Sequence, residues 1–170
     1  RACVPPSSAR WCFARHPRGS SVPFRGAVKR VDTTGGFRGT GALIALVGPT
    51  AVGKTEFAVK LSGYLPIEVI NADSRQVYRS MDIGTGKPSL SERARVPHHV
   101  FDVVNPDDEF SLAEYLRHAR AALDSITVRG HLPLVVGGSG QYVWSLMEGW
   151  HVPGLPPDAA FRMRLERLLY

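Results

Sequence analysis

One stretch of the chain has the residue types and the spacing of a phosphate-binding loop. It fits the pattern G-x-x-x-x-G-K-[ST] and reads Gly48-Pro49-Thr50-Ala51-Val52-Gly53-Lys54-Thr55. An apolar run at 42–47 precedes it and a helical pattern follows it, an order that argues against a chance match to a Gly-rich turn. In that setting the backbone N–H groups of the loop and the N-terminus of the helix converge on a phosphate chain. Lys54 then supplies a positive charge, and Thr55 supplies a hydroxyl group for Mg²⁺.

A carboxylate is expected at the same edge of the fold as this loop. Residues 67–70 have the apolar character of a second buried strand, and Asp73 follows shortly after its C-terminal end. Ligands of open α/β sheets bind beyond the carboxyl ends of the strands, so Asp73 should lie close to Lys54. The plainer alternative is that Asp73 caps the turn that follows it.

Strands and helices alternate over residues 41–170, which we take as one catalytic domain. Strands are expected at 42–47, 67–70, 100–104 and 132–136. Helices are expected after the loop, from Ser111 (with Glu114 in a capping box), at about 141–148 and from Phe161, with mostly loop at 79–97. This alternation predicts an α/β fold, a three-layer, P-loop NTPase-like parallel sheet with flanking helices. Because only four strands are visible, we expect an N-terminal part of the domain, truncated at the C-terminus.

The positive charge of the chain is concentrated in its first 41 residues. The net charge is +6, but residues 1–41 hold eight basic residues and one acidic residue, and residues 42–170 hold 13 basic and 14 acidic residues. The overall charge therefore does not indicate nucleic-acid binding. Residues 1–40 lack a hydrophobic period and are expected to be a disordered basic tail. Their composition resembles a transit peptide, although we favour an untranslated or misassigned upstream segment.

Cysteine content and hydropathy narrow the class of protein. Cys3 and Cys12 have neither the spacing nor the partners of a zinc site, and they do not suggest a disulfide framework. No apolar run in the sequence approaches the length of about 18 residues that a membrane span requires. We therefore expect a soluble, cytoplasmic protein that has no membrane partner and is a monomer.

Five motifs of this sequence, in their order, resemble those of the bacterial tRNA dimethylallyltransferases, also called tRNA isopentenyltransferases. They are the loop at 48–55 and the segments at 71–78, 81–88, 97–99 and 135–142. The resemblance covers about residues 42–168. It implies transfer of a dimethylallyl group from dimethylallyl diphosphate to N6 of an adenosine adjacent to the anticodon in tRNA, with Mg²⁺ required and ATP not consumed.

The resemblance also implies roles for particular residues. Asp73 would be the general base that accepts the proton of N6, since the nitrogen is a poor nucleophile. Thr50 would donate to the bridging oxygen of the diphosphate, which the loop at 48–55 binds, and Thr55 would hold Mg²⁺. Arg162 would be a second cation near the diphosphate. The implied contacts with tRNA are Asp73, Ser74, Arg75, Gln76, Ser139 and Arg162.

Several of these residues have plainer alternatives. Thr50 could merely form the turn, and Arg75 and Arg162 could be ordinary surface charges. His98 and His99 form a pair but lack further metal ligands nearby, so we favour a structural role for them. We place Asp102 on a strand, as a second-shell partner of Mg²⁺.

Two other functions are compatible with a phosphate-binding loop. One is an ATP-dependent small-molecule kinase, and the other is a non-catalytic nucleotide-binding module. The strand at 132–136 runs into Gly137-Gly138 rather than into the carboxylates expected of an ATP hydrolase, which argues against the kinase. A non-catalytic module would leave Asp73 and Thr50 without a role.

Overall fold

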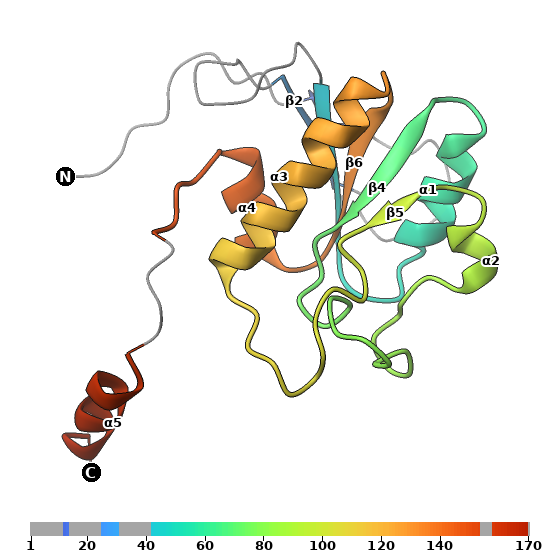
Figure 1. Cartoon of the computed structure of the whole chain (residues 1–170). Helices are drawn as coiled ribbons and strands as arrows, with labels where there is room; N and C mark the ends of the chain where they lie inside the picture. Colours follow the sequence, from blue (N-terminus) through green and yellow to red (C-terminus); the bar gives the residue numbers. More distant parts are fainter. Residues whose placement is uncertain (1–11, 14–24, 31–41, 154–157, 170) are drawn as a thin grey trace.

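The computed structural model describes residues 12–13, 25–30, 42–153 and 158–169. Within these ranges the chain forms a mixed sheet in the order β1-β2-β3-β6-β4-β5, with helices packed on both faces (Figure 1). The strands are β1 (Cys12–Phe13), β2 (Arg25–Arg30), β3 (Ala42–Val47), β4 (Ile67–Asn71), β5 (His98–His99) and β6 (Leu132–Gly137). The helices are α1 (Lys54–Ser62), α2 (Leu90–Arg93), α3 (Leu112–Val128), α4 (Gly140–Met147) and α5 (Ala159–Arg167).

Strands β3, β6, β4 and β5 are parallel, as the sequence predicts. At the carboxyl ends of the central strands, Val47 pairs with Gly137 and Asn71 pairs with Val136. Three segments therefore leave the sheet at the carboxyl ends of the strands: the phosphate-binding loop, the Asp73 turn and the Gly-rich turn after β6. An open α/β sheet binds its ligands at this end of its strands.

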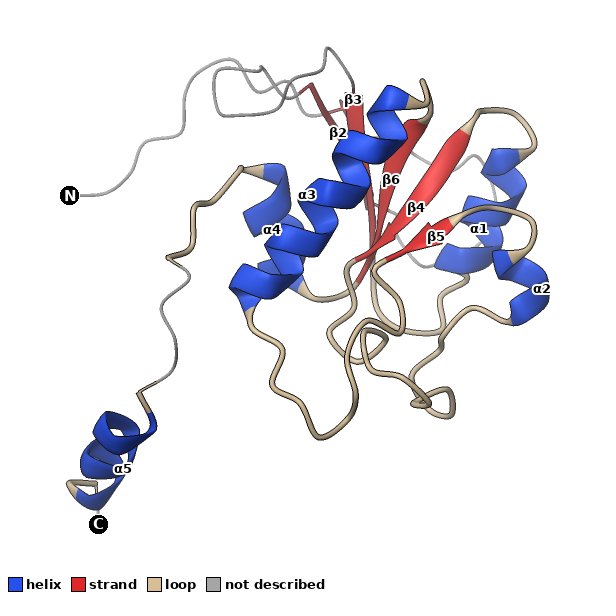
Figure 2. Ribbon diagram, viewed as in Figure 1, coloured by secondary structure: helices blue, strands red, loops and turns tan. Residues whose placement is uncertain are grey.

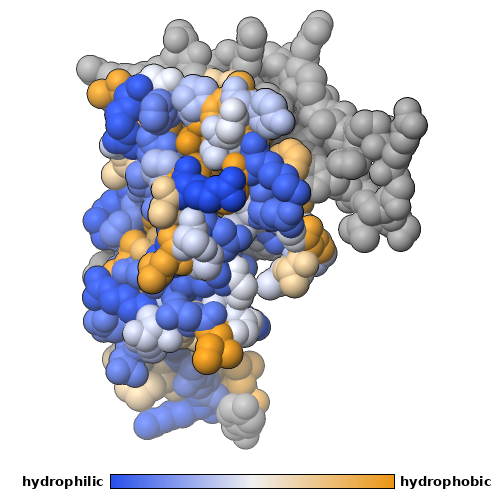
Figure 3. Space-filling model, turned by 90° about the vertical axis from the view of Figure 1, so that its right-hand side faces the viewer, coloured by the Kyte–Doolittle hydropathy of each residue, from blue (hydrophilic) through white to orange (hydrophobic). Residues whose placement is uncertain are grey.

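The sheet is the middle of three layers (Figure 2). Helices α3 and α4 cover one face, and α1 and α2 cover the other. Side chains of β3, β4 and β6 alternate between the two cores, so that on β3 Leu43 and Ala45 pack with α3 and α4, whereas Leu46 packs with α1. The surface around α1 and α2 is mainly hydrophilic with separate hydrophobic spots, as expected of an outer layer (Figure 3). The three-layer fold is thus confirmed.

The strand expected at 100–104 is wrong in its position. The structure places β5 at His98–His99, and Val104 only forms an isolated bridge with Tyr78. Val100 and Asp102 have φ values of +65° and +54°, which lie outside the β region of a regular strand. The apolar residues of this segment pack into the core from a loop, which produces a strand-like composition without a strand. The region at 79–97 also contains α2, which starts at a capping box of Ser89 and Glu92.

The expectation that residues 1–40 are disordered is wrong for residues 12–13 and 25–30, which form strands. Strand β2 pairs antiparallel with β3 over Arg25↔Val47 to Arg30↔Ala42, and β1 pairs with β2. Backbone N–H and C=O groups make this ladder, so β2 can cover the outer edge of β3 without an apolar period of its own. The rest of that segment lies outside the described residues, and the domain boundary at residue 40 stays a prediction.

A buried carboxylate joins the sheet to the end of α3. Glu68 of β4 is only 2 % exposed. Its Oε1 accepts hydrogen bonds from Arg129 Nε and His131 Nδ1, both at 2.8 Å, and its Oε2 accepts from Arg129 Nη2 at 2.7 Å and His99 Nε2 at 2.6 Å. Hydrogen bonds from Arg129 outweigh burial and, together with those from the two histidines, lower the pKa of Glu68 to about 2. The cluster therefore stabilises the fold as an ionised group.

Replacing Glu68 with glutamine is expected to lower the free energy of unfolding by about 1–3 kcal/mol, because it removes the buried charge that accepts hydrogen bonds from Arg129 and from two histidines. In the unmodified protein this contribution is complete above a pH of about 5 and is lost as the pH falls toward 2, because the folded pKa lies below the ordinary value of 4.5. Urea unfolding at several pH values measures both effects. Asp124→Asn, an exposed position on α3, is the control. Equal stability of Glu68→Gln and the control would contradict this role.

Candidate active site

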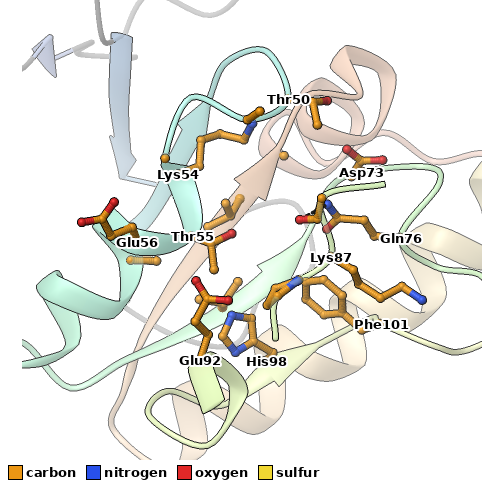
Figure 4. Close-up of a pocket in the computed structure, with 18 residues that line it drawn as sticks. Thr50, Lys54, Thr55, Glu56, Asp73, Gln76, Lys87, Glu92, His98 and Phe101 are labelled. Carbon is orange, nitrogen blue, oxygen red and sulfur yellow. Dashed lines mark hydrogen bonds between the residues drawn. The ribbon is translucent and has the colours of Figure 1, made fainter. Parts of the chain in front are cut away.

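A cavity of about 280 Å³ opens at the carboxyl edge of the parallel strands. Its walls come from the loop at 50–55, the turn after β4, the segment at 86–88 and α2. Thr50, Lys54 and Asp73 surround one end of it, whereas Glu92 and His98 lie at the other end (Figure 4). The structure thus brings together the phosphate-binding loop and the predicted base.

The phosphate-binding loop turns sharply before α1. Gly53 adopts φ +83° as the N-cap of α1, and Ala51 adopts φ +66°, a conformation uncommon for a residue with a side chain. The Phe57 N–H group donates to Gly53 O at 3.0 Å and begins the helix. These turns direct the first amides of α1 toward the cavity, where an anion would meet the positive end of the helix.

Lys54 supplies the positive charge of this loop. Its Nζ donates to Gly48 O at 2.9 Å and to Pro49 O at 2.6 Å. Because an ammonium group has three donors, one remains for a substrate oxygen. Burial lowers the pKa of Lys54, while the negative charge of Asp73 acts in the opposite direction. Lys54 and Asp73 are therefore electrostatically coupled across the cavity.

Asn71 holds the turn that presents Asp73. The Asn71 side chain is buried, and its Oδ1 accepts from the Asp73 N–H at 2.9 Å. Its Nδ2 donates to Asp73 O at 3.1 Å and to Val100 O at 3.0 Å. The Asp73 carboxylate lines the cavity, which is the position expected of a base. Its Oδ1 also accepts from the Arg75 N–H at 2.9 Å, so Asp73 caps its turn as well. Sequence reasoning assigned no role to Asn71, although it is the first residue of the motif at 71–78 and lies at the end of a strand.

The Gly-rich turn after β6 fits closely against this turn. A Cβ atom at Gly137 would lie 2.1 Å from Ala72 O, so only glycine is compatible with this approach. Ser139 Oγ accepts from the Ser74 N–H at 2.8 Å, and the Ser139 N–H donates to Ala72 O at 3.0 Å. Ser139 therefore lies at the rim beside the Asp73 turn and helps to hold it in place.

Gln76 connects the Asp73 turn to the segment at 85–86. Its Nε2 donates to Thr85 O at 2.9 Å and to Gly86 O at 3.1 Å. Both partners are carbonyl oxygens, so the orientation of the amide is determined and both of its N–H groups are used. Bidentate recognition of an adenine edge requires one of those N–H groups. In this arrangement Gln76 can therefore offer a bound base its Oε1 as an acceptor.

Other expected site residues lie farther out or do something else. Ser74 and Arg75 are exposed at the rim. Arg162 lies on α5 with its side chain 65 % exposed, 4.0 Å from Glu109, and is not part of the described cavity wall. The carboxylate of Asp102 is held by Lys87 at 2.8 Å and by Arg93 at 2.6 Å, and its second-shell role toward Mg²⁺ stays a prediction.

The two adjacent histidines have structural partners. His98 Nδ1 lies 2.6 Å from Val96 O, and burial lowers the pKa of its imidazole. His99 contacts Glu68. The described residues contain no group of three or more His, Cys, Asp or Glu side chains that could hold a metal. The contacts of the pair with Val96 O and Glu68 agree with a structural role, and His98 in addition lines the cavity.

Two family models match the chain. Residues 76–170 match the family described as IPP transferase, and residues 41–98 match the one described as Isopentenyl transferase. The chain belongs to the IPP transferase family. Its IPP transferase region contains Gln76, Lys87 and Ser139, and the second match contains the phosphate-binding loop and Asp73.

Similar proteins carry consistent names. Proteins named tRNA dimethylallyltransferase from Chloroflexus aggregans and Roseiflexus castenholzii are 52 % and 54 % identical to this chain over 126 and 125 residues. Each alignment covers 74 % of this chain, and 43 % and 41 % of the relatives respectively. The chain thus spans about two fifths of the length of these curated relatives.

Solved structures that resemble this chain also belong to transferases that act on tRNA by their names. The full-length tRNA isopentenylpyrophosphate transferase from Bacillus halodurans is 43 % identical, with a TM-score of 0.62, over 74 % of this chain and 41 % of that one. A eukaryotic dimethylallyltransferase acting on tRNA is 37 % identical, with a TM-score of 0.57, over 60 % of this chain and 25 % of that one. The P-loop NTPase-like fold expected from the sequence agrees with these neighbours.

Proposed function

We propose that this protein transfers a dimethylallyl group from dimethylallyl diphosphate to N6 of an adenosine adjacent to the anticodon in tRNA. The observation that supports this most directly is the presence of the phosphate-binding loop and Asp73 on one cavity in a member of the IPP transferase family. The names of its relatives, tRNA dimethylallyltransferase, support both substrates.

The phosphate-binding loop stabilises the leaving group in this proposal. Transfer breaks the bond between the allylic carbon and the diphosphate oxygen, so negative charge develops on the diphosphate. The amides at the start of α1 and the ammonium of Lys54 lie where they would neutralise that charge. Thr50 lines the same wall, and its hydroxyl group is the donor proposed for the bridging oxygen.

Asp73 acts on the nucleophile. The N6 lone pair of adenine is delocalised into the ring, so removal of an N6 proton during attack makes the nitrogen a better nucleophile. Asp73 lies on the same cavity as the leaving-group site, and Gln76 is next to it (Figure 4). The proton passes to the Asp73 carboxylate, while Gln76 Oε1 accepts from the exocyclic amine. The exposed Ser74 and Arg75, with the half-buried Ser139 beside them, form the rim that would meet the tRNA.

Mg²⁺ is the metal that fits this donor set. Thr55 lines the cavity next to Lys54. Among the described residues no three His, Cys, Asp or Glu side chains are grouped to form a protein cage for a metal, which suits an ion held mainly by diphosphate oxygens and water. Thr55 would hold the ion through its hydroxyl group, and the ion would add positive charge at the leaving group. Proximity of Arg162 to the diphosphate stays a prediction from the family resemblance.

No helix within the described parts of the chain is both long and apolar enough to cross a bilayer. The cytoplasmic location, the absence of a membrane partner and the monomeric state stay predictions from the sequence.

The experiment that tests the function follows the label from each possible donor. The full-length protein is incubated with tRNA, Mg²⁺ and either dimethylallyl diphosphate labelled in its carbon chain or ATP labelled at its γ-phosphate. Label from the first donor is expected in tRNA, and label from ATP is not expected in any product. Transfer of the γ-phosphate to a small molecule would overturn the proposal in favour of a kinase.

A further inference from the structure

Lys87 is a cation on the cavity wall that does not face the phosphate-binding loop. Its side chain is only 2 % exposed. The side chain extends away from Thr50 and Lys54 (Figure 4). Its Nζ donates to Tyr78 O, Asp82 Oδ1 and Asp102 Oδ1, each at 2.8 Å. These partners use all three donors of the ammonium group, so Lys87 differs from Lys54 in having none left for a substrate phosphate.

Asp102 is the centre of the contacts around Lys87. Its Oδ1 accepts from Lys87, and its Oδ2 accepts from Arg93 Nη1 at 2.6 Å. Its backbone carbonyl accepts from Arg79 Nε at 3.0 Å. Asp102 thus joins three segments that are separated in sequence, around 79, 87 and 93. Its φ of +54° is a strained conformation that persists only where surrounding contacts impose it.

The segment that Lys87 anchors contacts two residues of the proposed reaction. The Thr85 and Gly86 carbonyls accept both N–H groups of Gln76. Gly86 lies so close to the loop that a Cβ atom there would be 3.2 Å from Thr50 Cγ2. Thr85 Oγ1 donates to Met81 O at 2.7 Å and closes the turn from the other side. The position of Lys87 therefore sets the wall that lies between Gln76 and Thr50.

The charges of this network are mutually dependent. Burial alone would lower the pKa of Lys87, but hydrogen bonds to Asp102 and Asp82 outweigh burial and raise it. Burial alone would raise the pKa of Asp102, but Lys87 and Arg93 outweigh burial and lower it. Neutralising one member leaves the other as a poorly compensated charge.

We propose that Lys87, held by Asp102, is a positioning residue that fixes the Thr85–Gly86 backbone and thereby orients Gln76 and Thr50 for dimethylallyl transfer. This inference rests on the proposed function. It assigns Lys87 an effect on the geometry of the reacting groups and none on the binding of diphosphate.

The test compares three variants of the full-length protein: Lys87→Met, Asp102→Asn and the double variant. Lys87→Met is expected to lower kcat by about 100-fold, the effect of a misplacement of about 1 Å. The Kd for dimethylallyl diphosphate should stay within about threefold, because Lys87 does not touch the diphosphate. The double variant should lose no more than the worse single variant, because the two residues act as a unit.

The matched control is Lys60→Met. Lys60 pairs with Glu56 at 2.6 Å on the surface of α1, with side chains 70 % and 68 % exposed, and should change neither constant. A rise of about tenfold in the Kd for dimethylallyl diphosphate in Lys87→Met, with kcat near that of the unmodified protein, would overturn the proposal in favour of direct phosphate binding. Additive losses in the double variant would also overturn it. If Lys87→Met does not fold, kcat and the Kd for dimethylallyl diphosphate are compared in Asp102→Asn instead, because that variant removes a charge from the same pair.

Amide hydrogen exchange separates this inference from the proposed function. Residues 81–88 should exchange faster in Lys87→Met and in Asp102→Asn than in the unmodified protein, while α3 should keep its protection. Unchanged exchange at 81–88 would contradict the anchoring role, whatever reaction the protein catalyses. Failure of the unmodified protein to transfer a dimethylallyl group would contradict the proposed function and leave the exchange result valid.

Discussion

Replacing Asp73 with asparagine is expected to lower kcat for dimethylallyl transfer by about 10²–10⁴-fold, the range that a general base contributes. The change removes the proton acceptor and its negative charge but keeps the hydrogen bonds of the turn. Asparagine retains an Oδ1 that can accept from the Arg75 N–H, and Asn71 holds residue 73 through its backbone. The Kd for dimethylallyl diphosphate should therefore be unchanged. Single-turnover transfer to tRNA, with binding measured separately, distinguishes these two effects.

The control for Asp73→Asn is Asp107→Asn, which removes a carboxylate from an exposed loop. It should transfer at the rate of the unmodified protein. An Asp73→Asn protein that kept its rate would show that the carboxylate only caps its turn. Asn71→Ala provides a further comparison, because it keeps the carboxylate and removes the side chain that holds its backbone.

Replacing Lys54 with methionine is expected to weaken diphosphate binding and to lower kcat/KM by about 10²–10³-fold, as for loss of one donor to a developing anion. Lys54 places its ammonium group at the carbonyls of Gly48 and Pro49, inside the loop that would surround the phosphates. Calorimetric titration with inorganic diphosphate and with dimethylallyl diphosphate measures the binding. Both ligands should lose affinity together, because the interaction is with the phosphate part that they share.

The pH dependence of binding adds a second readout for Lys54. Burial lowers the pKa of its ammonium group, so the positive charge is lost at a lower pH than for an exposed lysine. Affinity for inorganic diphosphate should accordingly fall on the alkaline side in the unmodified protein and should lack that component in Lys54→Met. Lys60→Met is again the control. Undiminished affinity of Lys54→Met for inorganic diphosphate would exclude the assigned role.

Local sequence patterns were sufficient for much of the fold. The capping box of Ser111 and Glu114 correctly predicted the start of α3, and the apolar runs correctly placed β3, β4 and β6. Such features are encoded within a few neighbouring residues, since they depend on side-chain periodicity and on local hydrogen bonds. β5 was misplaced because the apolar residues after His99 are buried in a loop with positive φ values, and burial alone does not distinguish loop from strand.

For the candidate site too, some features follow from local sequence and others only from the tertiary structure. By itself, the sequence determined the phosphate-binding loop and the position of Asp73 at the end of a parallel strand, because a contiguous motif and a strand end are local properties. Only the tertiary structure decided that Asn71 reaches Val100 and that Gln76 is held by the segment at 85–86. It likewise decided that Lys87 meets Asp102 rather than a phosphate. These contacts join residues 9 to 29 positions apart, and packing of the intervening chain, which no local pattern specifies, brings them together.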